Sequence, residues 1–417
     1  MDETHDRPQV IDAALTRGLT EPRYTRAQLL KAAGAGAGML SLGGLLSACG
    51  VQGTASKATN TSFDWNAWWK KQHQTGTLDF ANWPLYIDTE HGKHPSLKQF
   101  TKQTGIKVNY SEVIQDNAPF YAKISPTLQA GQSVGYDIVV MTNDTWQLTE
   151  ILHVNGWAIP LDHSQIPNFF KYASPLVKNQ PYDPGNRYTA AWQSGLTGIA
   201  YDPRLTKREI TSVHDLFDPA FKGHVGMMSD NTELGSVGML ALGIDPVHST
   251  QADWKKAATM LTKQRDQGLV RQYYDQSYIK ALQNGDTWIT QAWSGDIYQA
   301  NNSGYPHLKF VVPNEGAMIW TDNMLIPKHA QHPVDALKWI NFYYQPKIAA
   351  QVADWVNYIT PVPAAQPILE QSDPAVGKSP LVFPTAQMSA RTHQYYTYKN
   401  YSDFQAWNNT FNPIIQS

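Results

Sequence analysis

The sequence predicts a two-lobed α/β fold in which each lobe is a mixed sheet flanked by helices. One observation is a β-α-β-α-β order of segments that begins near Thr77, and a second is a similar series that begins near Gly195. This alternation indicates a parallel or mixed sheet covered on both faces. A third is length, because about 370 residues follow an N-terminal export signal, enough for two lobes with separate cores.

The first series contains segments typical of helices and segments typical of strands. The helix predicted at residues 94–104 has Leu97 and Phe100 on one face and ends at Gly105. Residues 136–141 form an apolar run typical of a buried strand. The other predicted segments are strands at 78–83 and 106–110 and a helix at 120–131.

The second series and the return of the chain follow the same patterns. Its predicted strands are 198–201, 225–228 and 287–293, and its predicted helices are 233–242 and 251–267. The chain returns through strands at 310–313 and 317–320, followed by helices at 334–344 and 346–356. Before the first strand, Trp65, Trp68 and Trp69 have the spacing of one helical face, which we expect to pack onto the globular body rather than a membrane surface.

The only cysteine of the chain closes a short apolar run near the N-terminus. Cys49 follows Leu46-Ser47-Ala48, and the glycine- and alanine-rich run is preceded by Arg23, Arg26 and Lys31. Such a run is too short to span a bilayer as a helix and is typical of an export signal. The pattern resembles the lipobox of bacterial lipoproteins, whose cysteine receives a diacylglycerol.

We therefore expect residues 1–48 to be a signal peptide and residues 49–75 to be the lipidated cysteine and a tether. The mature chain would be anchored to the outer face of the cytoplasmic membrane. The alternative is a buried helix with a structural cysteine, although many glycines make a poor core helix. Ala27 replaces one arginine of a twin-arginine signal, so the general secretory and twin-arginine routes both stay open.

Composition and missing motifs argue against several classes of function. The formal net charge is −2, whereas nucleic-acid binding requires a strongly basic surface. The sequence has no glycine-rich phosphate loop and no His-Glu-x-x-His motif. We expect no cofactor, no metal and a monomer.

A series of short motifs runs from about residue 78 to residue 363. It opens with Asn82-Trp83-Pro84-Leu85-Tyr86, and its other members are residues 100–108, 120–124, 136–140, 221–223, 319–322, 337–342 and 358–361. In order and spacing these motifs resemble the spermidine/putrescine-binding proteins of bacterial ABC importers. The resemblance implies a type II periplasmic-binding-protein-like fold that holds a polyamine between its lobes and delivers it to a membrane permease.

The resemblance also implies a set of binding residues. Trp83 and Tyr86 match aromatic residues that clamp the polyamine, and Asp230 and Glu233 match acids that bind its ammonium groups. The remaining matches are Trp293, Trp320, Asp322 and Tyr358. For single residues simpler roles stay open, because Trp293 could be a core residue and Asp230 could only cap a helix.

One loop departs from the family pattern. The family follows its Val-Val strand with Pro-Ser and an aromatic residue, but here Met141 replaces the proline. Thr142 keeps a hydroxyl, Asp144 adds a fourth acid, and Trp146 replaces the aromatic residue. Near the C-terminus, Trp407 or Gln405 are further candidates for the cleft.

These residue types suit a polyamine on chemical grounds. Carboxylates hold ammonium groups through charge-assisted hydrogen bonds of about 1.5–3 kcal/mol each. Aromatic faces cover the methylenes and add cation–π attraction of about 0.5–2 kcal/mol. Three acids exceed what an uncharged sugar requires.

The predicted organisation has two lobes and three crossings. Lobe 1 comprises residues 76–197 plus 321–366, and lobe 2 comprises residues 198–320 plus 367–417. The crossings lie near residues 195–198, 320–321 and 364–366. Three alternatives stay open: a binding protein for ferric iron, a sugar or an amino-acid-like cation; a lipoprotein that senses polyamine without transporting it; and a secreted hydrolase using Asp230, Glu233 or Asp322 as acid and base.

Overall fold

The computed structural model describes residues 63–143 and 145–416. Residues 69–417 form one compact unit, and residues 63–68 are described by themselves. The predictions on the signal peptide, on Cys49, on the tether up to residue 62 and on Asp144 therefore lie outside the described residues. Within the described part, no helix has both the length and the apolar character that a membrane crossing requires.

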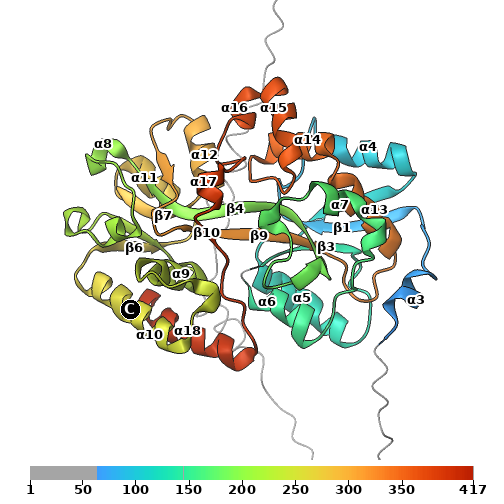
Figure 1. Ribbon diagram of the computed structural model, residues 1–417, viewed down its shortest axis with the longest axis horizontal. Coiled ribbons are helices and arrows are strands. Elements are labelled where there is room, and N and C mark those ends of the chain that lie inside the picture. Colours follow the sequence, from blue (N-terminus) through green and yellow to red (C-terminus); the bar gives the residue numbers. More distant parts are fainter. Residues whose placement is uncertain (1–62, 144, 417) are drawn as a thin grey trace, which may run out of the picture. The chain divides into compact units, whose positions relative to one another are not determined.

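One mixed sheet of ten strands organises the larger unit (Figure 1). The strand order is β2-β1-β3-β9-β4-β7-β5-β6, with β10 beside β9 and β8 beside β4. The strands are β1 (Thr77–Asn82), β2 (Lys107–Glu112), β3 (Ile138–Thr142), β4 (Thr189–Tyr201), β5 (Val225–Met228), β6 (Val270–Tyr274), β7 (Ile289–Trp293), β8 (Lys309–Val311), β9 (Ala317–Leu325) and β10 (Thr392–His393).

Two parallel groups of strands flank a central antiparallel pair. Strands β1, β2 and β3 run parallel and make the first half, and β5, β6 and β7 run parallel and make the second half. The central pair β4 and β9 joins them, with Ser194 opposite Thr321 and Gly195 opposite Trp320. The predicted mixed α/β architecture is confirmed, while the lobe boundaries and the hinge stay predictions.

Helices cover each half of the sheet. Figure 1 shows α4, α13 and α14 around the first half and α9, α11 and α12 around the second, with α10 and α18 outside α9. The predicted helices are confirmed as α4 (Pro95–Thr104), α5 (Asn117–Gln129), α9 (Asn231–Ala241), α10 (Gln251–Asp266), α13 (Pro333–Tyr343) and α14 (Pro346–Val356). Gly105 ends α4 in the left-handed conformation, and its N–H bonds to the Thr101 carbonyl, as its position in the sequence predicts.

The sequence patterns did not predict several of the elements. Strand β4 begins nine residues before the predicted strand at 198. The sequence did not predict this start because all residues of β4 are buried, so polar and apolar residues do not alternate along it. Strand β6 and two long helices, α12 (Ser294–Asn302) and α18 (Tyr401–Ile415), were also not predicted. The other helices are α3 (Trp65–Trp69), α6 (Trp146–Thr149), α7 (Pro167–Tyr172), α8 (Pro203–Thr206), α11 (Tyr278–Asn284), α15 (Gln366–Ser372), α16 (Pro374–Gly377) and α17 (Ala386–Ser389).

Each half has an aromatic core. In the first half the ring of Phe80 packs edge-on against Trp192, with centroids 5.8 Å apart. In the second half Trp254 packs edge-on against Trp407, with centroids 5.1 Å apart. Of the three predicted tryptophans, Trp69 belongs to the larger unit, where it is buried and donates its indole N–H to the Pro160 carbonyl at 2.9 Å.

Candidate ligand-binding site

Most of the predicted binding residues lie at or next to the ends of the parallel strands, beside the central pair β4 and β9. Strand β3 ends at Thr142 and β7 ends at Trp293, and both lie beside the central pair. In α/β sheets the carboxyl ends of strands are the usual place for a ligand.

Asp322 is the centre of a hydrogen-bonded group in the first half. The Tyr86 hydroxyl donates to its Oδ2 at 2.7 Å, and the Thr142 hydroxyl donates to its Oδ1 at 2.7 Å. The Asn117 side chain, at the start of α5, donates to Thr142 Oγ1 at 2.8 Å. The hydroxyls that orient the Asp322 carboxylate are neutral, so these bonds add no positive charge to the group.

Aromatic rings adjoin this group. Tyr358 packs edge-on against Tyr86 and Trp320, with centroids 5.9 and 5.4 Å away. Glycines make room for both ring systems, because a Cβ at Gly195 would lie 2.2 Å from the Trp320 ring and a Cβ at Gly295 would lie 2.5 Å from the Tyr358 ring. The neighbouring glycines therefore help to define where these rings lie.

Trp83 lies at the end of β1, close to the same group. Its indole N–H donates to the Val140 carbonyl of β3 at 3.3 Å. The side chain is half-buried, so part of its ring is open to solvent.

Glu233, in the first turn of α9, is the centre of a second group. Its Oε1 accepts from the Thr197 hydroxyl at 2.7 Å and from the Trp293 indole at 3.1 Å. Its Oε2 is buried and has no hydrogen-bond partner. Burial raises the pKa of Glu233 to about 7, and the neighbouring charge of Asp230 adds to this rise. A buried acceptor without a partner costs free energy unless a donor reaches it.

Asp230 caps α9, as its position before the helix allows. Its Oδ1 accepts from the backbone N–H groups of Thr232 and Glu233 at 2.8 and 3.0 Å. The side chain is exposed, so water reaches the carboxylate. Desolvation by the surrounding protein nevertheless raises the pKa of Asp230, and the negative charge of Asp116, the cap of α5, adds to this rise.

The two groups lie on one face of the sheet. Asp322 pairs with Gln193, Trp320 pairs with Gly195, and Thr197 lies two residues further along β4. Paired residues and alternate residues of a strand share a face. The Asp322 group and the Glu233 group are therefore about four residues apart along β4, which is about 13 Å, with Trp320 between them.

Comparison with known proteins identifies the family. The family described as bacterial extracellular solute-binding protein matches residues 96–384. The chain belongs to this family.

Several relatives align with most of this solute-binding protein. The spermidine/putrescine-binding periplasmic protein 1 of Haemophilus influenzae is 31% identical over 310 residues, which cover 74% of this chain and 82% of the relative. The spermidine/putrescine-binding periplasmic protein of Escherichia coli is 31% identical over 316 residues, covering 75% and 84%.

Solved structures show the same fold. The spermidine/putrescine ABC transporter substrate-binding protein of Streptococcus pneumoniae has a TM-score of 0.71 at 24% identity, covering 82% of this chain and 99% of that one. The two-lobed α/β class that the sequence predicts is thereby confirmed. As an extracellular solute-binding protein, the chain works outside the cytoplasm.

Three sequence candidates of this solute-binding protein lie elsewhere than expected. Trp407 is fully buried in the second half and donates to the Asn231 carbonyl at 3.2 Å, so it is a core residue. Gln405 is exposed on α18. Trp146 is buried against side chains at and just before α18.

Other residues at the site were not found from the sequence. Thr197 orients Glu233, and Asn117 orients Thr142. The Tyr395 hydroxyl lies 3.2 Å from Thr197 Oγ1. Gln394 accepts a hydrogen bond from the Asn143 side chain at 3.3 Å. Isolated polar residues carry no periodic signal, and these contacts join distant parts of the chain.

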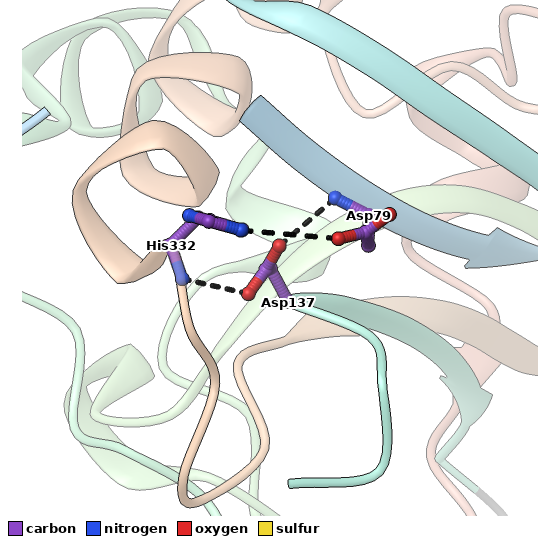
Figure 2. Close-up of side chains that lie close together, drawn as sticks. All are labelled: Asp79, Asp137 and His332. Carbon is purple, nitrogen blue, oxygen red and sulfur yellow. Dashed lines mark hydrogen bonds and ion pairs between the residues drawn. The ribbon is translucent and has the colours of Figure 1, made fainter. Parts of the chain in front are cut away.

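A second polar cluster of this solute-binding protein lies in the first half, towards the opposite end of the parallel strands (Figure 2). Asp79, Asp137 and His332 offer ligand atoms within 4.8 Å of one another, the spacing of a possible metal site. The Asp137 oxygens accept the backbone N–H groups of Asp79 and His332 at 2.9 and 2.8 Å. His332 Nε2 lies 3.9 Å from Asp79 Oδ2, and its Nδ1 lies 2.6 Å from the Thr75 hydroxyl. These partners account for the cluster as a tie between β1, β3 and α13.

Proposed function

We propose that this protein binds a polyamine of the putrescine or spermidine kind between the two halves and delivers it to the permease of an ABC importer. The observation that carries the proposal is one sheet face that presents Asp322 and the Trp320 ring, with Glu233 of α9 bonded to Thr197 further along the same face. The names of the relatives, several of them spermidine/putrescine-binding proteins, support the same ligand class.

The chemistry of this face matches a chain that carries more than one ammonium group. An ammonium donates three hydrogen bonds, and Asp322 is held ready by the Tyr86 and Thr142 hydroxyls. Glu233 offers its unpaired Oε2 to a second ammonium. Each charge-assisted bond contributes about 1.5–3 kcal/mol. The rings between the two acids cover the methylenes of the ligand.

The proposal extends to a set of ligand-contacting residues. We assign ligand contact to the residues of the two groups together with the loop acid: Trp83, Tyr86, Thr142, Asp144, Asp230, Glu233, Trp293, Trp320, Asp322 and Tyr358. Asp116, close enough to Asp230 to raise its pKa, adds negative charge near the second group.

We also propose how the protein is anchored to the membrane and how it closes around the ligand. We propose that Cys49 carries a lipid that holds a monomer near its permease, and that the tether predicted over residues 49–75 is free only before α3, because Trp69 is buried. Closure would take place about the central strands, near residues 195–198 and 320–321, as a hinge motion. The lobes would be residues 76–197 plus 321–366 and residues 198–320 plus 367–417.

A hydrolase is less well supported by the same geometry. Glycosidase carboxylates face each other across about 5–9 Å. The β4 residues beside Asp322 and Glu233, Gln193 and Thr197, lie four residues or about 13 Å apart, with Trp320 between them. We therefore infer ligand binding without catalysis.

A thermal-shift panel on the mature chain tests the ligand class. Putrescine and spermidine should raise the melting temperature in a concentration-dependent way, because a ligand that binds only the folded state stabilises it. Ferric citrate, glucose and γ-aminobutyrate, which represent the alternative solutes, should leave it unchanged. Stabilisation by one of these three and not by either polyamine would contradict the proposal.

A further inference from the structure

One side chain from the first half belongs to the hydrophobic core of the second half. Trp146 is 5% exposed and is a member of a buried cluster that packs around α9 and α10. The other buried members of this cluster, among the described residues, lie at or beyond Ile199. Trp146 itself begins α6, directly after β3 of the first half.

The partners of Trp146 come from α18 and the segment before it. The Trp146 ring stacks on Phe404 with centroids 5.5 Å apart and planes 13° apart. Tyr401 and Tyr398 adjoin it at 5.8 and 6.4 Å. Tyr398 in turn packs edge-on against Trp407, a fully buried residue of the second half. The contact therefore reaches the core of the second half.

The other end of this contact is fixed to the candidate binding site. The Thr145 hydroxyl donates to the Thr142 carbonyl at 3.0 Å and accepts from the Leu148 N–H at 3.3 Å, so Thr145 caps the turn that presents Trp146. Thr142 is the residue that donates to Asp322. Asn143 bonds to both backbone groups of Thr321 on β9, at 3.0 and 2.8 Å. A short, hydrogen-bonded segment thus connects Asp322 to Trp146.

We propose that Trp146 is a positioning residue for ligand capture, which holds the two halves together by docking its ring on Phe404, Tyr401 and Tyr398. This inference rests on the proposed function, because it assumes that the ligand binds between the halves. Trp146 makes its contribution through the arrangement of the halves and not through contact with the ligand.

Trp146 would affect ligand capture by shifting the equilibrium between open and closed arrangements of the two halves. A ligand that contacts both halves binds only when they are together, so its apparent affinity falls with the closed fraction. Stacked and edge-on aromatic contacts favour the closed arrangement. Loss of the ring should weaken spermidine binding about tenfold, mainly through faster dissociation.

The test compares Trp146→Ala, Trp146→Phe and a matched control, Trp157→Ala. Trp157 stacks on Tyr121 with centroids 6.4 Å apart, and both residues belong to the first half. Small-angle scattering on the full chain without ligand measures the radius of gyration, and surface plasmon resonance with spermidine measures the dissociation rate. Trp146→Ala should have a larger radius and faster dissociation, Trp146→Phe should restore both, and Trp157→Ala should match the wild type.

An unchanged radius of gyration in Trp146→Ala would overturn the proposal, even if affinity falls, because a purely local defect would then explain the loss. If Trp146→Ala does not fold, Phe404→Leu provides the same comparison from the other side of the contact. If the wild type binds no polyamine, the proposed function fails, whereas the scattering comparison still decides whether Trp146 joins the halves.

Discussion

Glu233 shows how one residue can prepare a site for a cation. One carboxylate oxygen is held by Thr197 and Trp293, and the other is buried without a partner. Burial and the adjacent Asp230 raise the pKa of Glu233 to about 7, so near neutral pH the group is partly protonated. An arriving ammonium favours the charged form and lowers this pKa, so ligand binding should release a proton.

The pH dependence of binding follows from this pKa. Between pH 8 and pH 6 the affinity for spermidine should fall about tenfold, because the ligand must displace the Glu233 proton. Calorimetry in buffers of different ionisation enthalpy measures the proton release, and Glu233→Gln should abolish it. A wild-type affinity that does not change between these pH values would contradict the assignment of Glu233.

The same shift has a consequence for stability. The folded-state pKa is raised above the ordinary value of 4.5, so protonation of Glu233 stabilises the ligand-free fold. This contribution is fully present below about pH 4.5 and is lost as the pH rises through about 7. The stability of the ligand-free protein and its affinity for ligand therefore change in opposite directions with pH, because binding strengthens as the Glu233 proton leaves.

At the scale of elements, the tie around Asp137 keeps β1, β3 and α13 in register at the end opposite the candidate site. Asp137 is buried, and desolvation raises its pKa, while the backbone N–H groups of Asp79 and His332 oppose this rise. The tie joins segments nearly two hundred residues apart in sequence, and no local pattern predicts it.

Removal of this tie should affect stability and not ligand binding. Asp137→Ala leaves two partly buried N–H groups, those of Asp79 and His332, without an acceptor, which should lower the free energy of unfolding by about 1–3 kcal/mol. Asp266→Ala, which removes an exposed ion pair with Arg265, is the matched control and should change stability by less than about 0.5 kcal/mol. Urea unfolding measures both. An Asp137→Ala variant as stable as the control would show that the cluster is not a structural tie.

The elements that the sequence predicted are those with a local signal. Helix α4 has an apolar face, a proline at its start and a glycine at its end, and β3 is a continuous apolar run. Strand β4 lacked such a signal because it is buried on all sides. Helix α18 was missed although it carries Trp407 and Phe411, because its apolar residues are interleaved with amides.

The site was predicted from motif order, and the structure adds the contacts that order cannot give. Asp322 and Tyr86 are far apart in sequence, yet their side chains are hydrogen-bonded. Thr197 carries no motif and was missed, because its role depends on the neighbouring position of Glu233. Trp146 replaces an aromatic residue of the family pattern, and the structure directs it to α18.

At the scale of the whole molecule, the central strands β4 and β9 give the protein its mechanism. They carry Gly195, Thr197, Trp320 and Asp322 on one face and join the two halves. A ligand held on this face therefore contacts the elements about which the halves would move. The Trp146 contact adds a further connection between the halves, from α6 to α18.

The central claim is that two separate acids on this face bind the ammonium groups of one polyamine. Isothermal calorimetry with spermidine on the wild type, Asp322→Asn and Glu233→Gln tests it most directly, with Asp286→Asn as the control. Asp286 is an exposed acid paired with Arg271 before β7, at the end of that strand opposite Trp293. Each site variant should lose about 1–3 kcal/mol of binding free energy, while the control retains the wild-type affinity. Wild-type affinity in both site variants would contradict the claim.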